Sequence, residues 1–275
     1  MEIDSTDQSK PEATPTFEEA QASQPTQVSE PRPQGWTYWD VVVVTGFAIG
    51  AQMFVYVAGV IALLLIGQAR GGTATLFDGM TRVSFVLPVQ ILWWALVFWV
   101  IYRVVRARDP RPFRLAIGWV RPARPIGVYL SGGAFLALSV AVFAWALPSP
   151  RKHMPMEQLF RDPFSASVLA VFGVSIAPVI EELLFRGFLY PVVARAHGAA
   201  VAVVGTALLF SVVHAPQYGW AWQNLLLLTY VGVAFGTIRA VSGTLVPSTL
   251  VHAAYNFTLF VGLFAASDRF RHLNF

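Results

Sequence analysis

Two adjacent glutamates and an arginine lie inside an apolar run of this sequence, in the stretch APVIEELLFRGFLYP. The residues are Glu181, Glu182 and Arg186. Ionised side chains at membrane depth are expensive, so they need charged partners or a chemical task. A carboxylate with little water around it is suited to general acid–base chemistry. The other acids after residue 36 lie in loops or at the ends of apolar runs: Asp40, Asp78, Asp109, Glu157, Asp162 and Asp268.

Helical geometry separates the two glutamates. Arg186 follows Glu182 by four residues, so the two side chains lie about 40° apart around a helix axis and can form an ion pair. Glu181 lies about 140° from Arg186 and is poorly placed to share that partner. We therefore predict that Glu182 pairs with Arg186 and that Glu181 is free to act. The alternative is that both glutamates bind Arg186 in a purely structural network.

Two histidines and an asparagine in later apolar runs extend this set of polar residues. His214 follows Phe210 by four residues in FSVVH, and Asn256 follows His252 by four residues in HAAYN, so each pair shares a helix face. Histidine exchanges protons near neutral pH. Together with a free glutamate, these residues point to acid–base chemistry inside the membrane. We interpret the remaining histidines as surface residues: His153, His197 and His272.

The elements that must position these residues are membrane-spanning helices. The chain is 56% hydrophobic and only 12% charged. Most of its long apolar runs reach or approach the roughly 20 residues that cross a bilayer core as a helix, and they do not alternate as barrel strands do. The sequence predicts an all-α polytopic membrane protein with about seven spans, eight being the alternative. The runs are Val41–Gly67, Val83–Tyr102, Ile126–Leu147, Ser165–Ile180, Ala199–Val213, Leu225–Ile238 and Leu245–Ala266.

Charge is distributed unevenly along the chain and predicts its orientation. Residues 1–36 hold seven acids and two bases, a net charge of −5, and their polar composition predicts disorder. Residues 103–125 hold seven arginines and one acid, which predicts a cytoplasmic loop. Since two spans separate these segments, the N-terminus is expected in the cytoplasm and the protein in the plasma membrane. The arginines are Arg103, Arg106, Arg108, Arg111, Arg114, Arg121 and Arg124.

The chain divides into five predicted regions. An acidic tail is followed by three scaffold spans, a connecting loop that contains a short interfacial helix at Met156–Phe160, a four-helix catalytic membrane core and a C-terminal tail. Without cysteine, the chain has neither disulfides nor thiol chemistry. The expected partners are the bilayer and a peptide or protein substrate, with no nucleic acid. The regions are 1–36, 37–147, 148–164, 165–266 and 267–275.

Three motifs resemble the ordered signature of a known family. EELLFR, FSVVH and HAAYN are similar to EExxxR, FxxxH and HxxxN, which characterise the CPBP family of intramembrane proteases. This family comprises type II CAAX prenyl endopeptidases, bacteriocin-processing enzymes and lysostaphin-resistance-like proteins. The resemblance covers about residues 165–265 and implies cleavage near a C-terminus, after a prenylated cysteine, or within a small precursor peptide. It implies a catalytic set of Glu181, Glu182, His214, His252 and Asn256, supported by Arg186 and Phe210.

Peptide hydrolysis requires an activated water, stabilisation of an oxyanion and a proton for the leaving amine. Glu181 could act as the general base, while His214 shares the water and moves the proton. His252 and Asn256 could donate to the oxyanion. Glu181, His214 and His252 could also ligate Zn²⁺ with an open position for water. The helical zinc motif HExxH is absent, and a metal-free glutamate mechanism suits these residues equally well.

Two other functions compete with proteolysis. A non-catalytic relative could act as a scaffold or immunity protein, and a proton-coupled transporter could use the Glu–Arg and His network as a relay. Inverted repeats that would favour a transporter are not found in the sequence. One geometric conflict stands against a shared site. His214 comes late in its apolar run and His252 early, so straight spans of equal length would put them at different depths.

Overall fold

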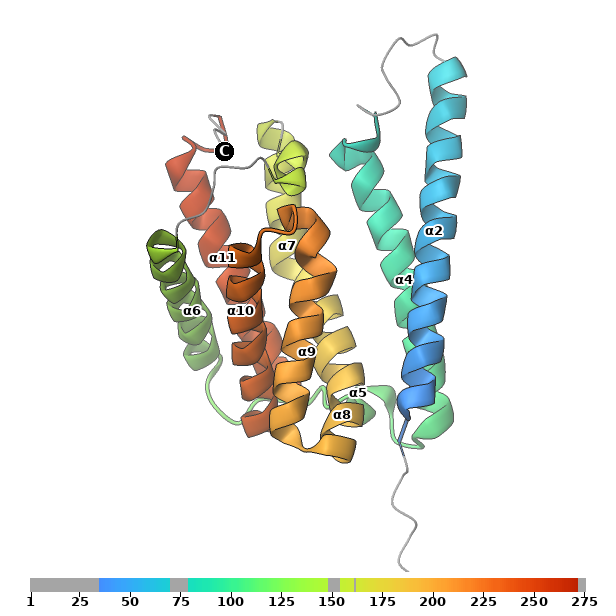
Figure 1. Ribbon diagram of the computed structural model, residues 1–275, viewed down its shortest axis with the longest axis vertical. Helices are drawn as coiled ribbons and strands as arrows, with labels where there is room; N and C mark the ends of the chain where they lie inside the picture. The colour runs from blue at the N-terminus through green and yellow to red at the C-terminus, as the bar shows by residue number, and fades with distance from the viewer. Residues whose placement is uncertain (1–34, 70–78, 148–153, 161, 272–275) are drawn as a thin grey trace, which may run out of the picture. The chain divides into compact units, whose positions relative to one another are not determined.

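The computed structural model describes residues 35–69, 79–147, 154–160 and 162–271. Seven helical segments in these ranges are long and apolar enough to cross a membrane, and none of the described residues forms a strand. The chain is therefore a polytopic all-α membrane protein, as predicted (Figure 1). Most of the predicted acidic tail, together with His153 and His272, lies outside the described residues. The elements are α2 (Tyr38–Ala69), α4 (Val83–Arg108), α5 (Phe113–Ala116), α6 (Ile126–Ala146), η1 (Pro155–Leu159), α7 (Pro163–Glu182), η2 (Leu183–Leu189), α8 (Tyr190–His197), α9 (Ala199–His214), η3 (Ala215–Tyr218), α10 (Trp222–Ser242) and α11 (Val246–Ala266).

The fourth candidate span, Pro163–His197, contains the EELLFR motif. With 35 residues it is the longest of the seven spans in the described ranges. It consists of α7, the π-helix η2 and α8. The predicted apolar run ends at Ile180, but the helix continues through both glutamates, and the charge of Glu182 is paired with Arg186 inside the bundle. At about 1.5 Å per residue the span would measure about 50 Å, which exceeds the apolar thickness of a bilayer.

Glycines allow two pairs of helices to approach closely. On α6, a Cβ at Gly133 would lie only 2.4 Å from the Val251 carbonyl oxygen of α11. On α10, a Cβ at Gly232 would lie 2.9 Å from the Cα of Ala207 on α9. Small residues at such contacts are the usual means of packing helices in a membrane, where apolar burial supplies little driving force. Figure 1 shows α9 and α10 side by side.

An apolar cluster joins the first two spans to the segment after α7. Val44 of α2 and Ile101 of α4 pack in one buried group with Leu183 and Phe188 of η2. Trp36, which precedes α2, belongs to the same cluster, and only 2% of its surface is exposed. The predicted scaffold therefore contacts the helix that carries the two glutamates.

The connection before α7 contains the short helix that the sequence predicted at Met156–Phe160. It is a 3₁₀-helix, η1, at Pro155–Leu159. Asp162 then caps α7, because its carboxylate accepts hydrogen bonds from the Ser165 N–H at 2.9 Å and the Ser165 hydroxyl at 2.7 Å. The Ser165 backbone N–H holds the pKa of Asp162 below its usual value. This cap fixes the start of the helix that carries the glutamates.

The arginine-rich connection between α4 and α6 packs against the start of α11. The Leu245 N–H donates to the Gly118 carbonyl at 2.7 Å, and Ile117 beside it is buried. Arg111 forms an ion pair with Asp109 at 2.7 Å, and its hydrogen bonds hold the pKa of that carboxyl below its usual value. The cytoplasmic location of this connection stays a prediction.

Candidate active site

The predicted ion pair between Glu182 and Arg186 is confirmed. The Arg186 Nη1 atom donates to Glu182 Oε1 at 3.0 Å, and both side chains are fully buried. The Arg186 Nη2 atom donates to the Gly232 carbonyl at 2.8 Å. The guanidinium also lies 5.2–5.7 Å from the ring centres of three phenylalanines: Phe185, Phe210 and Phe235. Together these contacts compensate a cation that would otherwise be costly at this depth.

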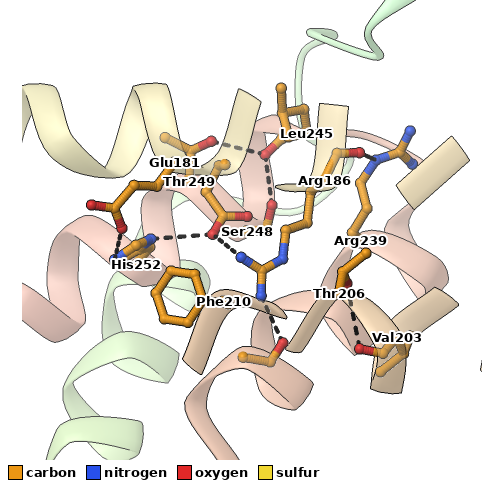
Figure 2. A network of polar contacts seen from close by, with 12 residues as sticks. Glu181, Arg186, Val203, Thr206, Phe210, Arg239, Leu245, Ser248, Thr249 and His252 are labelled. Atoms are coloured by element: carbon orange, nitrogen blue, oxygen red, sulfur yellow. Dashed lines mark hydrogen bonds and ion pairs between the residues drawn. The ribbon is translucent and has the colours of Figure 1, made fainter. Parts of the chain in front are cut away.

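Glu181 faces two histidines from later helices. Its Oε1 atom lies 3.8 Å from His214 Nε2, and its Oε2 atom lies 3.7 Å from His252 Nε2. These distances are longer than direct hydrogen bonds. The Glu181 side chain is 18% exposed, whereas Glu182 is fully buried. Figure 2 shows Glu181 and His252 facing each other beside the buried Arg186.

Both histidines are held through their Nδ1 atoms. His214 Nδ1 lies 2.7 Å from the Phe210 carbonyl, and His252 Nδ1 lies 3.1 Å from Glu182 Oε1. Since a carbonyl and a carboxylate accept hydrogen bonds, each Nδ1 carries a proton. Each Nε2 is then left to exchange protons on the side that faces Glu181. The predicted division is observed, with one glutamate in the supporting network and the other facing the histidines.

Aromatic rings fix the orientation of the two imidazoles. The His252 ring stacks on Phe235, with 4.3 Å between ring centres and 25° between planes. The His214 ring lies 4.4 Å from that of Phe210, one turn earlier on α9. Phe210, the first residue of FSVVH, therefore both contacts Arg186 and supports His214. The four-residue spacing in the sequence indicated the contact of Phe210 with His214, whereas nothing in the sequence indicated its contact with Arg186.

The predicted conflict in depth does not occur. Helix α9 has 16 residues and ends at His214. His252 is seventh in α11. Both imidazoles nevertheless face Glu181, with the Nε2 atoms of His214 and His252 at 3.8 and 3.7 Å from its carboxylate oxygens.

Asn256 lies on the same helix as His252 but bonds elsewhere. Its Nδ2 atom donates to the Gly173 carbonyl of α7 at 2.7 Å. A Cβ at Gly173 would lie 2.9 Å from the ring of Phe260, one turn beyond Asn256, so α7 and α11 approach closely here. Asn256 thus joins the helix of the glutamates to the helix of His252. Its role toward an oxyanion stays a prediction.

An apolar crevice between α4 and α7 opens beside Glu181. Trp93, Trp94 and Phe98 of α4 line it together with Ile180 and Glu181. The sequence prediction assigned α4 to the scaffold and did not include these aromatic residues in the site. Their signal was weak, because tryptophans are common in membrane helices for reasons unrelated to a substrate.

Zinc was one of two alternatives that the sequence left open. A tetrahedral zinc places neighbouring nitrogen and oxygen ligands about 3.3 Å apart, whereas Glu181 lies 3.7 and 3.8 Å from the two Nε2 atoms. In the part of the chain that the structure describes, no group of three or more His, Cys, Asp or Glu side chains is arranged to hold a metal ion. The described side chains as they stand do not have the geometry of a metal site.

Comparison with models of protein families gives a match for the membrane core. Residues 163–258 match the family model described as type II CAAX prenyl endopeptidase Rce1-like. No curated protein and no solved structure was found to match the chain. The matched range runs from the start of α7 to α11 and contains Glu181, Glu182, Arg186, Phe210, His214, His252 and Asn256. This membrane core, with its buried Glu–Arg pair and its second glutamate facing two histidines, is thus similar to the Rce1-like type II CAAX prenyl endopeptidases, which supports the resemblance to the CPBP intramembrane proteases.

Proposed function

We propose that this protein is an intramembrane endopeptidase that uses Glu181 to activate water. The observation that supports this most directly is the position of Glu181, which is partly exposed and faces the Nε2 atoms of His214 and His252. A purely structural glutamate would be expected to pair as Glu182 does. Two histidines whose Nδ1 atoms are occupied can hold a water or an oxyanion at Nε2.

The proposed reaction has two steps. Glu181 takes a proton from water as the hydroxide attacks the carbonyl carbon of the scissile bond, and the carbonyl oxygen becomes an oxyanion. His252, oriented by Glu182 and Phe235, stabilises that oxyanion through Nε2 in its protonated form. As the C–N bond breaks, His214 passes the proton held by Glu181 to the leaving amine. The site then returns to its starting protonation.

The substrate is proposed to be a membrane-associated peptide with an apolar part. The aromatic side chains of α4 that surround a small crevice beside Glu181 support this, because an apolar part of a substrate could lie against them. The family name supports a prenylated C-terminal peptide, and a small precursor peptide is the other substrate type that the family resemblance implies.

The test is cleavage by purified protein in lipid nanodiscs. Farnesylated CAAX peptides, the same peptides without the lipid, and a mixture of secretory precursor peptides would be offered, with products identified by mass spectrometry. Glu181→Gln should lower kcat by a factor of about 10² or more, since it removes the base but keeps the shape of the side chain. Undiminished cleavage by Glu181→Gln would refute the assignment of the base. A zinc chelator in the same assay decides the question of metal, because only a metal enzyme would lose activity and regain it with added zinc.

A further inference from the structure

The π-helix η2 leaves a carbonyl without a backbone donor close to the catalytic pair. In η2 the Tyr190 N–H donates to the Phe185 carbonyl, five residues earlier, and is thus withdrawn from Arg186, four residues earlier. The next residue, Pro191, has no N–H. The Arg186 carbonyl therefore lacks the donors that an α-turn and a π-turn would supply, four and five residues ahead. A buried carbonyl without a donor is costly, so a donor must come from another element.

That donor is a side chain of α10. The Arg239 Nε atom donates to the Arg186 carbonyl at 3.2 Å. The Arg239 guanidinium also lies 5.5 Å from the ring centre of Tyr190, the residue directly after η2. Figure 2 shows Arg239 approaching the Arg186 backbone from the side opposite to the Arg186 guanidinium.

A second donor comes from the segment before α2. The Trp36 Nε1 atom donates to the Phe188 carbonyl in η2 at 2.7 Å, although the two residues are 152 positions apart. The Trp36 ring stacks on the Phe188 ring, with 5.7 Å between centres and 5° between planes. The Arg195 guanidinium lies 5.6 Å from the centre of the Trp36 ring and donates a hydrogen bond to the Trp36 carbonyl. The position of Trp36 is thus fixed from three directions.

These contacts explain how an irregular helix can serve the site. The π-helix begins directly after Glu182 and contains Arg186, so its register determines where the guanidinium meets the carboxylate. Glu182 in turn orients His252. π-Helical turns are uncommon and need outside support, and they occur often at functional sites.

We propose that Arg239 and Trp36 are positioning residues for the catalytic network. Each supplies a hydrogen bond to a carbonyl of η2 and thereby holds the register that places Arg186 on Glu182 and His252 opposite Glu181. Neither residue belongs to the three motifs, and neither touches the reacting atoms. The proposal rests on the proposed function only in its kinetic readout.

The first experiment replaces Trp36 with phenylalanine in the full-length protein in nanodiscs. Trp36→Phe keeps an aromatic ring for stacking but removes the N–H donor. Trp39→Phe is the matched control, because Trp39 is 69% exposed on α2. We expect Trp36→Phe to lower kcat about tenfold with KM within about twofold, since the crevice is untouched while the catalytic groups are misplaced. Trp39→Phe should match the wild type.

The second experiment tests the Arg239 donor through rescue. Arg239→Met keeps much of the apolar stem and removes the donor, so kcat should fall about tenfold or more. Arg239→Lys restores an N–H donor and should recover part of the lost kcat. If kcat fell equally in both variants while KM and the amide hydrogen exchange of η2 stayed unchanged, the guanidinium would have a role other than this hydrogen bond. That result would overturn this half of the proposal.

Amide hydrogen exchange gives a readout that does not depend on activity. Peptides covering residues 183–192 should exchange faster in Trp36→Phe and Arg239→Met than in the wild type and in Trp39→Phe. If the wild-type protein cleaved no peptide, the proposed function would fail, and exchange alone would still decide whether these residues hold η2. Unchanged exchange would overturn the proposal, as would faster exchange with unchanged kcat in an active enzyme.

Discussion

At the scale of single residues, two neighbouring glutamates differ because Glu182 has close hydrogen-bonded partners, whereas Glu181 faces two histidines at longer distances. Glu182 Oε1 accepts from Arg186 at 3.0 Å and lies 3.1 Å from His252 Nδ1, and the side chain is fully buried. Glu181 is 3.7 Å or more from both facing nitrogens. A buried carboxylate with a cationic partner is a structural group, whereas one that faces two exchangeable nitrogens can act on water. Loss of each should therefore have a different physical consequence.

Glu182→Gln is expected to destabilise the protein, whereas Glu181→Gln is not. The first substitution leaves the Arg186 cation buried without its counterion, and breaking a buried pair in this way costs about 3–5 kcal/mol. The second removes a charge whose nearest partners are two histidine nitrogens at 3.7 and 3.8 Å, and it leaves no buried cation without its counterion. Thermal unfolding of both variants in the same detergent checks this, with a clearly lower Tm expected for Glu182→Gln only. An equal fall in Tm for both variants would mean that the two glutamates share Arg186 in one structural network.

At the scale of elements, the sequence predicts what is local and misses what is distant. The four-residue spacings of Glu182 with Arg186 and of Phe210 with His214 predicted contacts that the structure contains. Trp36 could not be found in this way, because it bonds to a residue 152 positions away. The π-helix was also missed, since apolar periodicity does not distinguish an α-turn from a π-turn over seven residues. The local feature of the sequence that is consistent with a π-turn is Pro191, because proline has no backbone N–H to donate to the preceding turn.

The contact between α6 and α11 is likewise between residues far apart in the sequence, so local spacing did not predict it. It can be tested by substitution. Gly133→Ala should lower the apparent Tm, because its Cβ would lie 2.4 Å from the Val251 carbonyl and the helices would have to separate, at a cost of about 1–3 kcal/mol. Gly132→Ala is the matched control. Its Cβ would have only an ordinary contact at 3.9 Å, so the better helix propensity of alanine should leave stability unchanged or slightly higher. Equal Tm values for the two variants would contradict the close packing of α6 on α11.

At the scale of the whole molecule, the number of spans and the side of each loop are linked. Seven candidate spans put the two ends of the described chain on opposite sides of the membrane. The connection between α4 and α6 and the turn at η3 are separated by three of these spans, so they too must lie on opposite sides. The arginines of residues 103–125 predict that the first of these loops is cytoplasmic.

Single cysteines can test this topology cleanly, because the chain has no cysteine of its own. Ala123→Cys lies in the arginine-rich connection and Gln217→Cys lies in η3, and both positions are exposed. In intact cells, a membrane-impermeant maleimide should label Gln217→Cys but reach Ala123→Cys only after the membrane is permeabilised. Labelling of both positions from one side would require an even number of spans between them, which is incompatible with the helices observed. The reverse pattern would keep the seven spans but place Arg103–Arg124 outside, and it would show that the positive charge does not set the orientation of this protein.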